Sequence, residues 1–127
     1  MLAQEKLVAF LGTSNADAAR AFYEGVLGLT FVADYEYLVI FDSGAARLML
    51  QKTDAVTPPH GTALGWHVKD LAASMRDLAH RGVAFERFDG MDQDEMGVWR
   101  PEGPATGVCW FKDPDGNLLS LSQSAPD

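Results

Sequence analysis

The three histidines and an acidic loop are the side chains of this chain best suited to bind a metal or move a proton. The histidines are His60, His67 and His80, and no two of them have the spacing that puts two ligands on one face of an element. The acids between 89 and 95 do not fit a calcium loop, because Gly103 stands where a bidentate glutamate is required. We therefore expect a structural His67 that faces the helices, and a solvated acidic loop.

Large apolar side chains are the other candidates, because aromatic walls with a few polar groups form pockets for flat or hydrophobic molecules. Alternation along each expected strand separates residues that face helices, such as Leu48 and Leu50, from residues that face a cavity. The predicted ligand-binding residues are Phe10, Arg47, Met49, Gln51, Leu64, Trp66, Trp99, Trp110 and Ser120. Two questions stay open. The tryptophans either line a pocket or simply fill the core, and Trp99 is either a lid residue or a packed surface aromatic.

Two similar halves of the chain position these side chains. Each half has a strand, then a helix that ends at a glycine (Gly28 or Gly82), then further strands. The expected strands are 7–11, 30–34, 37–42 and 46–52, then 63–68, 83–88, 107–112 and 117–123, with the second helix at 70–81. The order βαβββ, twice, predicts an α+β fold with helices on one face of each sheet and a shared cavity on the other. The inserted segment 89–106 either covers a site or is a solvated excursion.

Length and composition bound the class of protein. A chain of 127 residues predicts one domain, 1–127, made of modules 1–53 and 61–127. The net charge of −8 excludes nucleic acid as a partner and would attract a cationic ligand, although it also simply favours solubility. The single cysteine, Cys109, indicates a buried inert thiol and a reducing cytosol. No export signal and no apolar run of about 20 residues is visible, so we expect a cytoplasmic protein without a membrane partner.

Three motifs resemble a known family. They are the stretch Phe22-Tyr23-x-x-Val26-Leu27-Gly28-Leu29, the strand before Asp70, and the hairpin Phe111-x-Asp113-Pro114-Asp115-Gly116-Asn117. Together they resemble the vicinal oxygen chelate superfamily, which includes glyoxalase I, extradiol dioxygenases, fosfomycin-resistance enzymes and bleomycin-resistance proteins. The resemblance implies two βαβββ modules whose sheets curve into a half-barrel with helices on the outer face, and it implies a homodimer.

The resemblance also implies a divalent metal at four strand positions, which in this chain are Val8, Met49, Leu64 and Ser120. A hydrocarbon side chain has no atom that binds such a metal, and thioether and hydroxyl groups are poor ligands for it. We therefore predict no metal and no cofactor. The chain then resembles the bleomycin-resistance proteins, which sequester a small molecule. Its expected ligand is aromatic or amphipathic, and the acidic charge of the chain is compatible with a cationic one.

Two other functions stay open. One is an enzyme, a glyoxalase-like or dioxygenase-like lyase or isomerase that uses no metal or unconventional ligands, for which Glu36, Asp94 and Glu95 are the available acids. The other is a structural or regulatory module whose cavity is filled by its own side chains.

Overall fold

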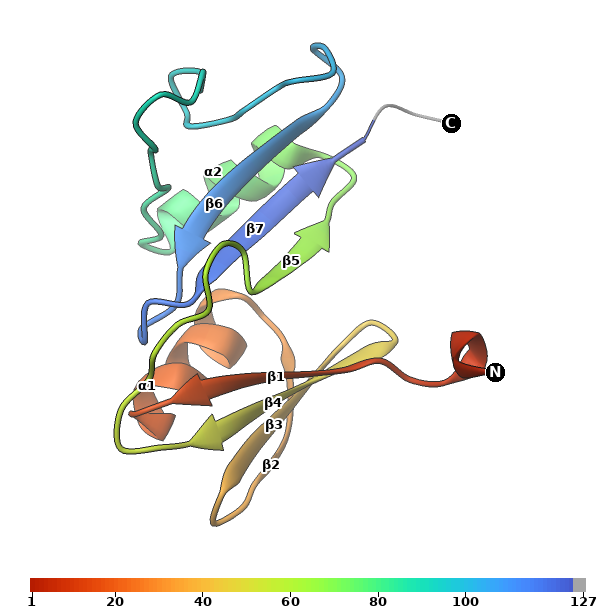
Figure 1. The fold of residues 1–127 in the computed structure, drawn as a ribbon, viewed down its shortest axis with the longest axis vertical. Coiled ribbons are helices and arrows are strands. Elements are labelled where there is room, and N and C mark those ends of the chain that lie inside the picture. The colour runs from red at the N-terminus through yellow and green to blue at the C-terminus, as the bar shows by residue number, and fades with distance from the viewer. Residues whose placement is uncertain (125–127) are drawn as a thin grey trace. The chain divides into compact units, whose positions relative to one another are not determined.

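The computed structural model describes residues 1–124 and shows an α+β fold in two compact units (Figure 1). The first unit comprises Met1–Pro59 together with Asp113–Asn117. The second unit comprises His60–Lys112 and the described residues from Leu118 onward. The hairpin that carries the third family-like motif therefore groups with the first half of the chain and not with the strands that it joins.

A four-stranded mixed sheet forms the first unit, with strand order β1-β4-β3-β2. Strands β1 and β4 are parallel and the other neighbours are antiparallel. Leu48 and Leu50 are buried on the side of the helices, as the alternation predicts, while Arg47, Met49 and Gln51 face the opposite way. The elements of this unit are η1 (Leu2–Gln4), β1 (Val8–Thr13), α1 (Ala16–Arg20), η2 (Ala21–Val26), β2 (Thr30–Asp34), β3 (Leu38–Ser43) and β4 (Ala46–Lys52).

The helix of the first unit begins at Asn15, whose side chain accepts a hydrogen bond from the Ala18 amide at 3.0 Å. Its second half, η2, is a π-helix and leads to Gly28, which has a φ of 76°. From cap to glycine, this helix is one residue longer than the corresponding helix of the second unit, which runs from Asp70 to Gly82. The wider π turn accommodates that extra residue while both helices keep their packed faces.

A three-stranded mixed sheet, β5-β7-β6, forms the second unit. Helix α2 covers one of its faces, where Leu71, Met75 and Leu78 are buried (Figure 1). Cys109 is buried on this side too, and burial raises the pKa of its thiol to about 11, which fits the predicted inert thiol. The elements are β5 (Leu64–His67), α2 (Leu71–His80), β6 (Gly107–Lys112) and β7 (Leu118–Gln123).

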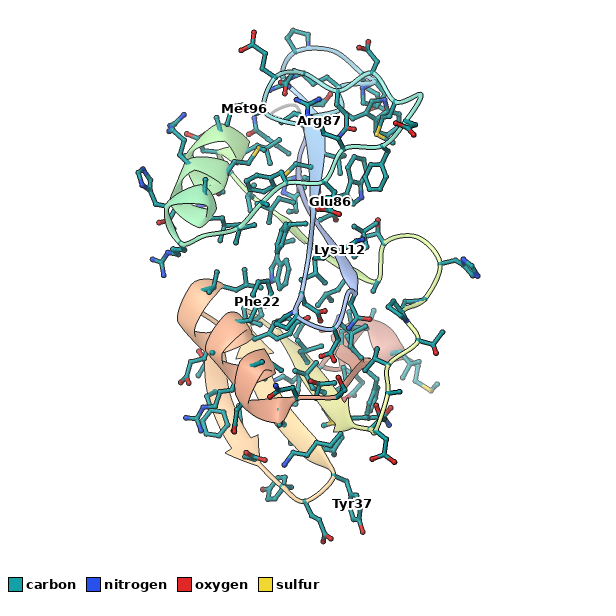
Figure 2. All side chains as sticks on the ribbon, turned by 90° about the vertical axis from the view of Figure 1, so that its left-hand side faces the viewer. Phe22, Tyr37, Glu86, Arg87, Met96 and Lys112 are labelled. Atoms are coloured by element: carbon teal, nitrogen blue, oxygen red, sulfur yellow. The ribbon has the colours of Figure 1, made fainter. Side chains whose placement is uncertain are left out.

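The predicted strand at 83–88 is wrong, because this segment has no regular ladder. It touches β6 through the Glu86 amide, which donates to the Trp110 carbonyl at 2.8 Å, and through an ion pair of 3.5 Å between Glu86 and Lys112 (Figure 2). The Gln93 side chain forms hydrogen bonds with two backbone groups of this segment, accepting from Phe88 N and donating to Glu86 O. A side-chain amide thus replaces the partner strand.

The facing predicted for strand β5 is also wrong. Leu64 is paired with Leu119 and Trp66 with Leu121, so both lie on the helix side, whereas His67 is paired with Ser122 on the opposite side. The reason is a one-residue slip in aligning the two halves. The helix caps Asn15 and Asp70 are equivalent residues in the two halves. Val8 comes seven residues before Asn15, and the residue seven before Asp70 is Ala63 rather than Leu64.

Candidate functional site

The open face of each sheet, defined as the side away from its helices, is the candidate binding surface. The strand register makes the two open faces equivalent position by position, because Phe10 pairs with Met49 as Gly65 pairs with Ser120. The first open face consists of Val8, Phe10, Leu38, Ile40, Arg47, Met49 and Gln51. The second consists of Gly65, His67, Val108, Trp110, Ser120 and Ser122.

The first open face presents apolar surface beside a closed ion network. Phe10 is 55% exposed and Val8 is 37% exposed. Arg47 donates two hydrogen bonds to Asp42, at 2.8 and 3.2 Å, and Lys6 pairs with the same carboxylate at 3.1 Å. The hydrogen bonds from Arg47 and then Lys6 lower the pKa of Asp42 to about 2. The positive charge of Arg47 is therefore already matched by a partner of its own unit.

A pocket of about 380 Å³ opens beside this apolar surface. Two predicted site residues, Phe10 and Gln51, contribute to it, and no side chain with a formal charge does. The chain after β4 supplies another wall, and a Cβ atom placed on Gly12 would lie 3.4 Å from the Val56 side chain. The full lining is Phe10, Leu11, Gly12, Gln51, Thr53, Ala55, Val56, Thr57, Pro59 and Asn117.

Three aromatic rings cluster on the second open face. Trp110 is only 9% exposed and lies between Phe88, whose ring is perpendicular with centroids 5.5 Å apart, and Trp99, at 6.2 Å. The Trp110 indole Nε1 donates to the Thr62 hydroxyl at 2.9 Å. Trp110 is therefore a buried ring at the base of this cluster with its indole N–H hydrogen-bonded, and Trp99 is the more accessible ring.

Trp99 is fixed in place by its backbone. It exchanges two hydrogen bonds with Val108, at 2.9 and 3.0 Å, and so takes the position beside β6 that a fourth strand would occupy. This pairing places Trp99 on the open face, next to the Trp110 ring. The structure brings the Trp99 and Trp110 rings together on the open face, with Trp99 paired to the edge strand β6.

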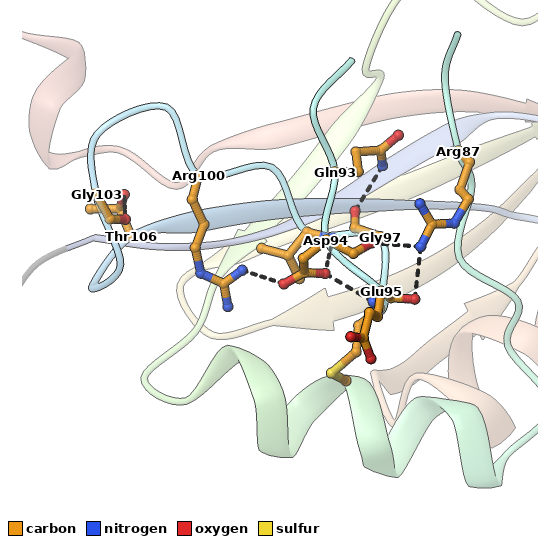
Figure 3. Close-up of polar contacts among 10 residues, drawn as sticks. Arg87, Gln93, Asp94, Glu95, Gly97, Arg100, Gly103 and Thr106 are labelled. Atoms are coloured by element: carbon orange, nitrogen blue, oxygen red, sulfur yellow. Dashed lines mark hydrogen bonds and ion pairs between the residues drawn. The ribbon is translucent and has the colours of Figure 1, made fainter. Parts of the chain in front are cut away.

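Asp94 organises the inserted loop (Figure 3). One of its carboxylate oxygens accepts from the amides of Met96 and Val98 at 2.9 Å, and the other accepts from Arg100 at 2.6 Å. Arg87 donates to the Asp94 and Glu95 carbonyls. Burial acts to raise the pKa of Asp94, but these hydrogen bonds outweigh it and leave the pKa below its usual value. Asp94 therefore shapes the loop through its hydrogen bonds, while the acids of the loop stay exposed to solvent.

A pocket of about 320 Å³ lies where this loop meets the ends of β6 and β7. It lies between Trp99 and polar groups from both strands, and among the described residues that line it only Glu102 has a formal charge. The lining residues are Trp99, Pro101, Glu102, Thr106, Gly107, Val108, Ser122, Gln123 and Ser124.

Gly65 is a site residue that the sequence analysis missed. A Cβ atom at this position would overlap the Ser120 hydroxyl, so glycine leaves the space into which Ser120 points. A glycine inside a strand pattern is itself a signal of such a close approach. Phe88 was missed because its segment was read as a regular strand.

The residues at the four strand positions where the resemblance implies a metal do not fit one. With the corrected alignment those positions carry Val8, Met49, Ala63 and Ser120, so the donors are one thioether and one hydroxyl. Among residues 1–124, no group of three or more His, Cys, Asp or Glu side chains gathers as a metal site. The donor set gives no chemical basis for a divalent cation there.

Residues 7–121 match the model of the Glyoxalase/Bleomycin resistance protein/Dioxygenase superfamily, and the chain belongs to that family. No curated protein sequence matches the chain. Three solved structures illustrate the shared fold. The antibiotic binding protein TnmS3 from Streptomyces sp. CB03234 has 23% identity and a TM-score of 0.72, with 98% of this chain and 99% of that one covered. Lactoylglutathione lyase from Agrobacterium tumefaciens has 22% identity and a TM-score of 0.71 over 95% and 94%.

The third is a glyoxalase/bleomycin resistance protein/dioxygenase from Alicyclobacillus acidocaldarius, with 20% identity and a TM-score of 0.73 over 98% and 94% of the two chains. At these identities the likeness shows the fold alone. In the part of the chain that the structure describes, no helix has the length and apolar character needed to span a bilayer.

Proposed function

We propose that this chain is a small-molecule binding protein whose open sheet faces hold an aromatic or amphipathic ligand without a bound metal. The observation that carries the proposal is the chemistry of these faces. Each has a pocket walled by an accessible aromatic ring, Phe10 in one and Trp99 in the other. The four strand positions where the resemblance implies metal ligands carry side chains that bind divalent cations weakly or not at all.

The proposed ligand contacts follow the strand register. On the first open face they are Phe10, Arg47, Met49 and Gln51, and on the second they are Trp99, Trp110 and Ser120. Leu64 and Trp66 are not included, since they lie on the helix side of their sheet. The likeness to TnmS3, described as an antibiotic binding protein, supports a sequestering role. The net charge of −8 favours a cationic ligand.

A panel of aromatic ligands and divalent metals tests the proposal by thermal shift and calorimetry. An aromatic ligand should raise the melting temperature, because binding to the native state stabilises it, and Trp99→Ala should weaken that ligand about tenfold or more. Mn²⁺, Ni²⁺ and Zn²⁺ should leave the melting temperature unchanged. Tight one-to-one binding of any of these metals would refute the metal-free part of the proposal.

A second candidate is an enzyme, a metal-independent lyase or isomerase, and the placement of His67 favours it. His67 lies on the open face, where its Nε2 is 3.1 Å from the Ser124 hydroxyl and 3.2 Å from the Ser124 amide nitrogen. The fold shared with a lactoylglutathione lyase is compatible with this candidate. If turnover of any α-hydroxy or α-keto thioester is found, His67→Asn should abolish it, whereas equal turnover by the variant would remove His67 as the base.

We also propose that the chain acts as a cytoplasmic homodimer. Light scattering coupled to gel filtration should give twice the mass of 13.8 kDa at micromolar concentration. A mass that stays at one chain over the whole concentration range would contradict the dimer.

A further inference from the structure

We infer that the pocket between the 99–106 segment and the ends of β6 and β7 is a subsite for an organic cation, with Trp99 as the aromatic wall and Glu102 as the counter-charge. This inference rests on the proposed function, and it adds a location and a residue that sets the charge preference. All of its lining residues belong to the second unit.

Within residues 1–124, Glu102 is the one charged residue that lines the pocket. No ion pair joins Glu102 to any residue in the described part of the chain, so its charge is not matched internally. The nearest cation in the sequence, Arg100, is held by Asp94 at 2.6 Å and is therefore compensated (Figure 3). A ligand ammonium or guanidinium group would meet one carboxylate without a competing cation.

The polar lining is otherwise neutral and largely occupied. The Gln123 carbonyl oxygen accepts from the Leu71 amide at 2.7 Å, and its NH₂ group donates to the Ala105 carbonyl at 3.4 Å. The Thr106 hydroxyl donates to the Gly103 carbonyl. The two bonds of Gln123 connect β7 to the loop and to the start of α2, and together these bonds leave few donors in the lining for an anion.

Trp99 supplies the second attraction. Its ring packs against Trp110, and its backbone N–H and C=O both form hydrogen bonds with Val108, so the indole is preorganised. A cation over a tryptophan face gains about 0.5–2 kcal/mol depending on its hydration, or roughly 2-fold to 30-fold in affinity. A pocket of about 320 Å³ suits a ligand with one aromatic ring and a substituted ammonium group.

Three probes of one shape but different charge test the inference. They are (4-hydroxyphenyl)trimethylammonium, neutral 4-tert-butylphenol and anionic 4-hydroxybenzenesulfonate, each titrated into the full chain at pH 7. Binding is followed by calorimetry and by the indole N–H resonance of Trp99, assigned with Trp99→Phe. We expect the cation to bind about tenfold more tightly than the neutral isostere, with the anion weakest. The cation should shift the Trp99 resonance more than that of Trp66.

Glu102→Gln is the decisive variant, and Glu36→Gln is its matched control. Both remove one negative charge, but Glu36 lies in the first unit and outside the pocket. Glu102→Gln should reduce the cation's affinity to within about twofold of the neutral probe and leave the neutral probe unchanged, while Glu36→Gln should preserve the preference.

The outcomes separate the two proposals. If the neutral probe binds as tightly as the cation, or if both variants weaken the cation equally, the cation subsite is refuted and the binding function stands. If none of the probes binds at millimolar concentration and no aromatic ligand of the wider panel binds either, the binding function itself is refuted.

Discussion

The two open faces use the same strand register to present opposite surfaces. In the first unit an exposed Phe10 and a buried Ile40 flank Met49, whereas in the second unit Gly65 and Trp110 flank Ser120. The large open-face side chain of the first unit, Phe10, is on the outer parallel strand β1, whereas that of the second unit, Trp110, is on β6, the antiparallel neighbour of β7. In the first unit the aromatic ring is exposed at the surface, and in the second it is covered by Phe88 and Trp99.

The helix-facing sides diverge much less. Both are aliphatic and aromatic, both helices begin at a side-chain cap, and both end at a glycine with positive φ. The physical reason is that a packed core restricts volume at each position, whereas an open face is restricted only by what it contacts. The repeat therefore keeps the fold and allows the open faces to specialise.

Replacement of Trp110 and of Phe10, one aromatic residue from each open face, should give the largest contrast. Trp110→Ala should lower the free energy of unfolding by about 3–5 kcal/mol, because it empties a covered site. Phe10→Ala should change it by less than about 1 kcal/mol, because more than half of that side chain is exposed. Urea denaturation measures both, and equal losses would show that Phe10 is covered in solution.

The Tyr23 hydroxyl is a contact that the second unit lacks. It donates to the buried Asp113 carboxylate at 2.7 Å, while the equivalent residue of α2 is Leu78. Burial and then the Asp113 charge raise the pKa of Tyr23 well above its usual value. Tyr23→Phe should destabilise the protein by about 1–3 kcal/mol, because a buried carboxylate loses a donor. Tyr35→Phe, at an exposed site, is the control and should be neutral in the same denaturation.

Gly65→Ala tests the space in the second open face. The new methyl group would overlap the Ser120 hydroxyl and should cost about 1–3 kcal/mol. In a Ser120→Ala background the cost should fall, since the overlapping atom is gone, and a double-mutant cycle measures the difference. Gly25→Ala, where a Cβ atom meets nothing within 4 Å, should not be destabilising through overlap. Equal costs in both backgrounds would argue against this contact.

The smallest expected effect concerns acid stability in the first unit. The pKa of Asp42 falls from 3.8 to about 2 in the folded protein. A depressed pKa contributes stability above the unfolded value, and that contribution is lost as the pH falls from 3.8 toward 2. The carboxyl carbon resonance of Asp42 should titrate near pH 2, and Arg47→Met should move that midpoint upward. A midpoint that Arg47→Met leaves unchanged would mean that the ion network is open in solution.

Most of the fold could be predicted from the sequence. Hydrophobic periodicity located both helices and seven strands, and glycines marked the helix ends. The segment at 83–88 was missed because nothing local shows that the Gln93 side chain will take the backbone groups of Glu86 and Phe88. The facing of Leu64 and Trp66 was missed because the two halves were aligned one residue out of step, and a one-residue shift moves every side chain of a strand to the other face.

The site was predicted only in part. Phe10, Met49, Gln51, Trp110 and Ser120 could be placed by alternation, and the structure puts them on open faces. Arg47 lies there too, but its pairing with Asp42 depends on which strands are neighbours. Glu102 could not be singled out, because a pocket formed by a loop and two strand ends leaves no periodic signal.

The sequence by itself determined the repeat, the elements and the absence of strong metal donors at the strand positions, because these depend on residue type and spacing along the chain. Only the tertiary structure decided which side of β5 faces the helix, how Asp94 and Gln93 build the inserted loop, and which carboxylate is left uncompensated beside Trp99. Those features depend on contacts between residues distant in sequence, and such contacts are selected by packing and hydrogen bonding of the whole unit.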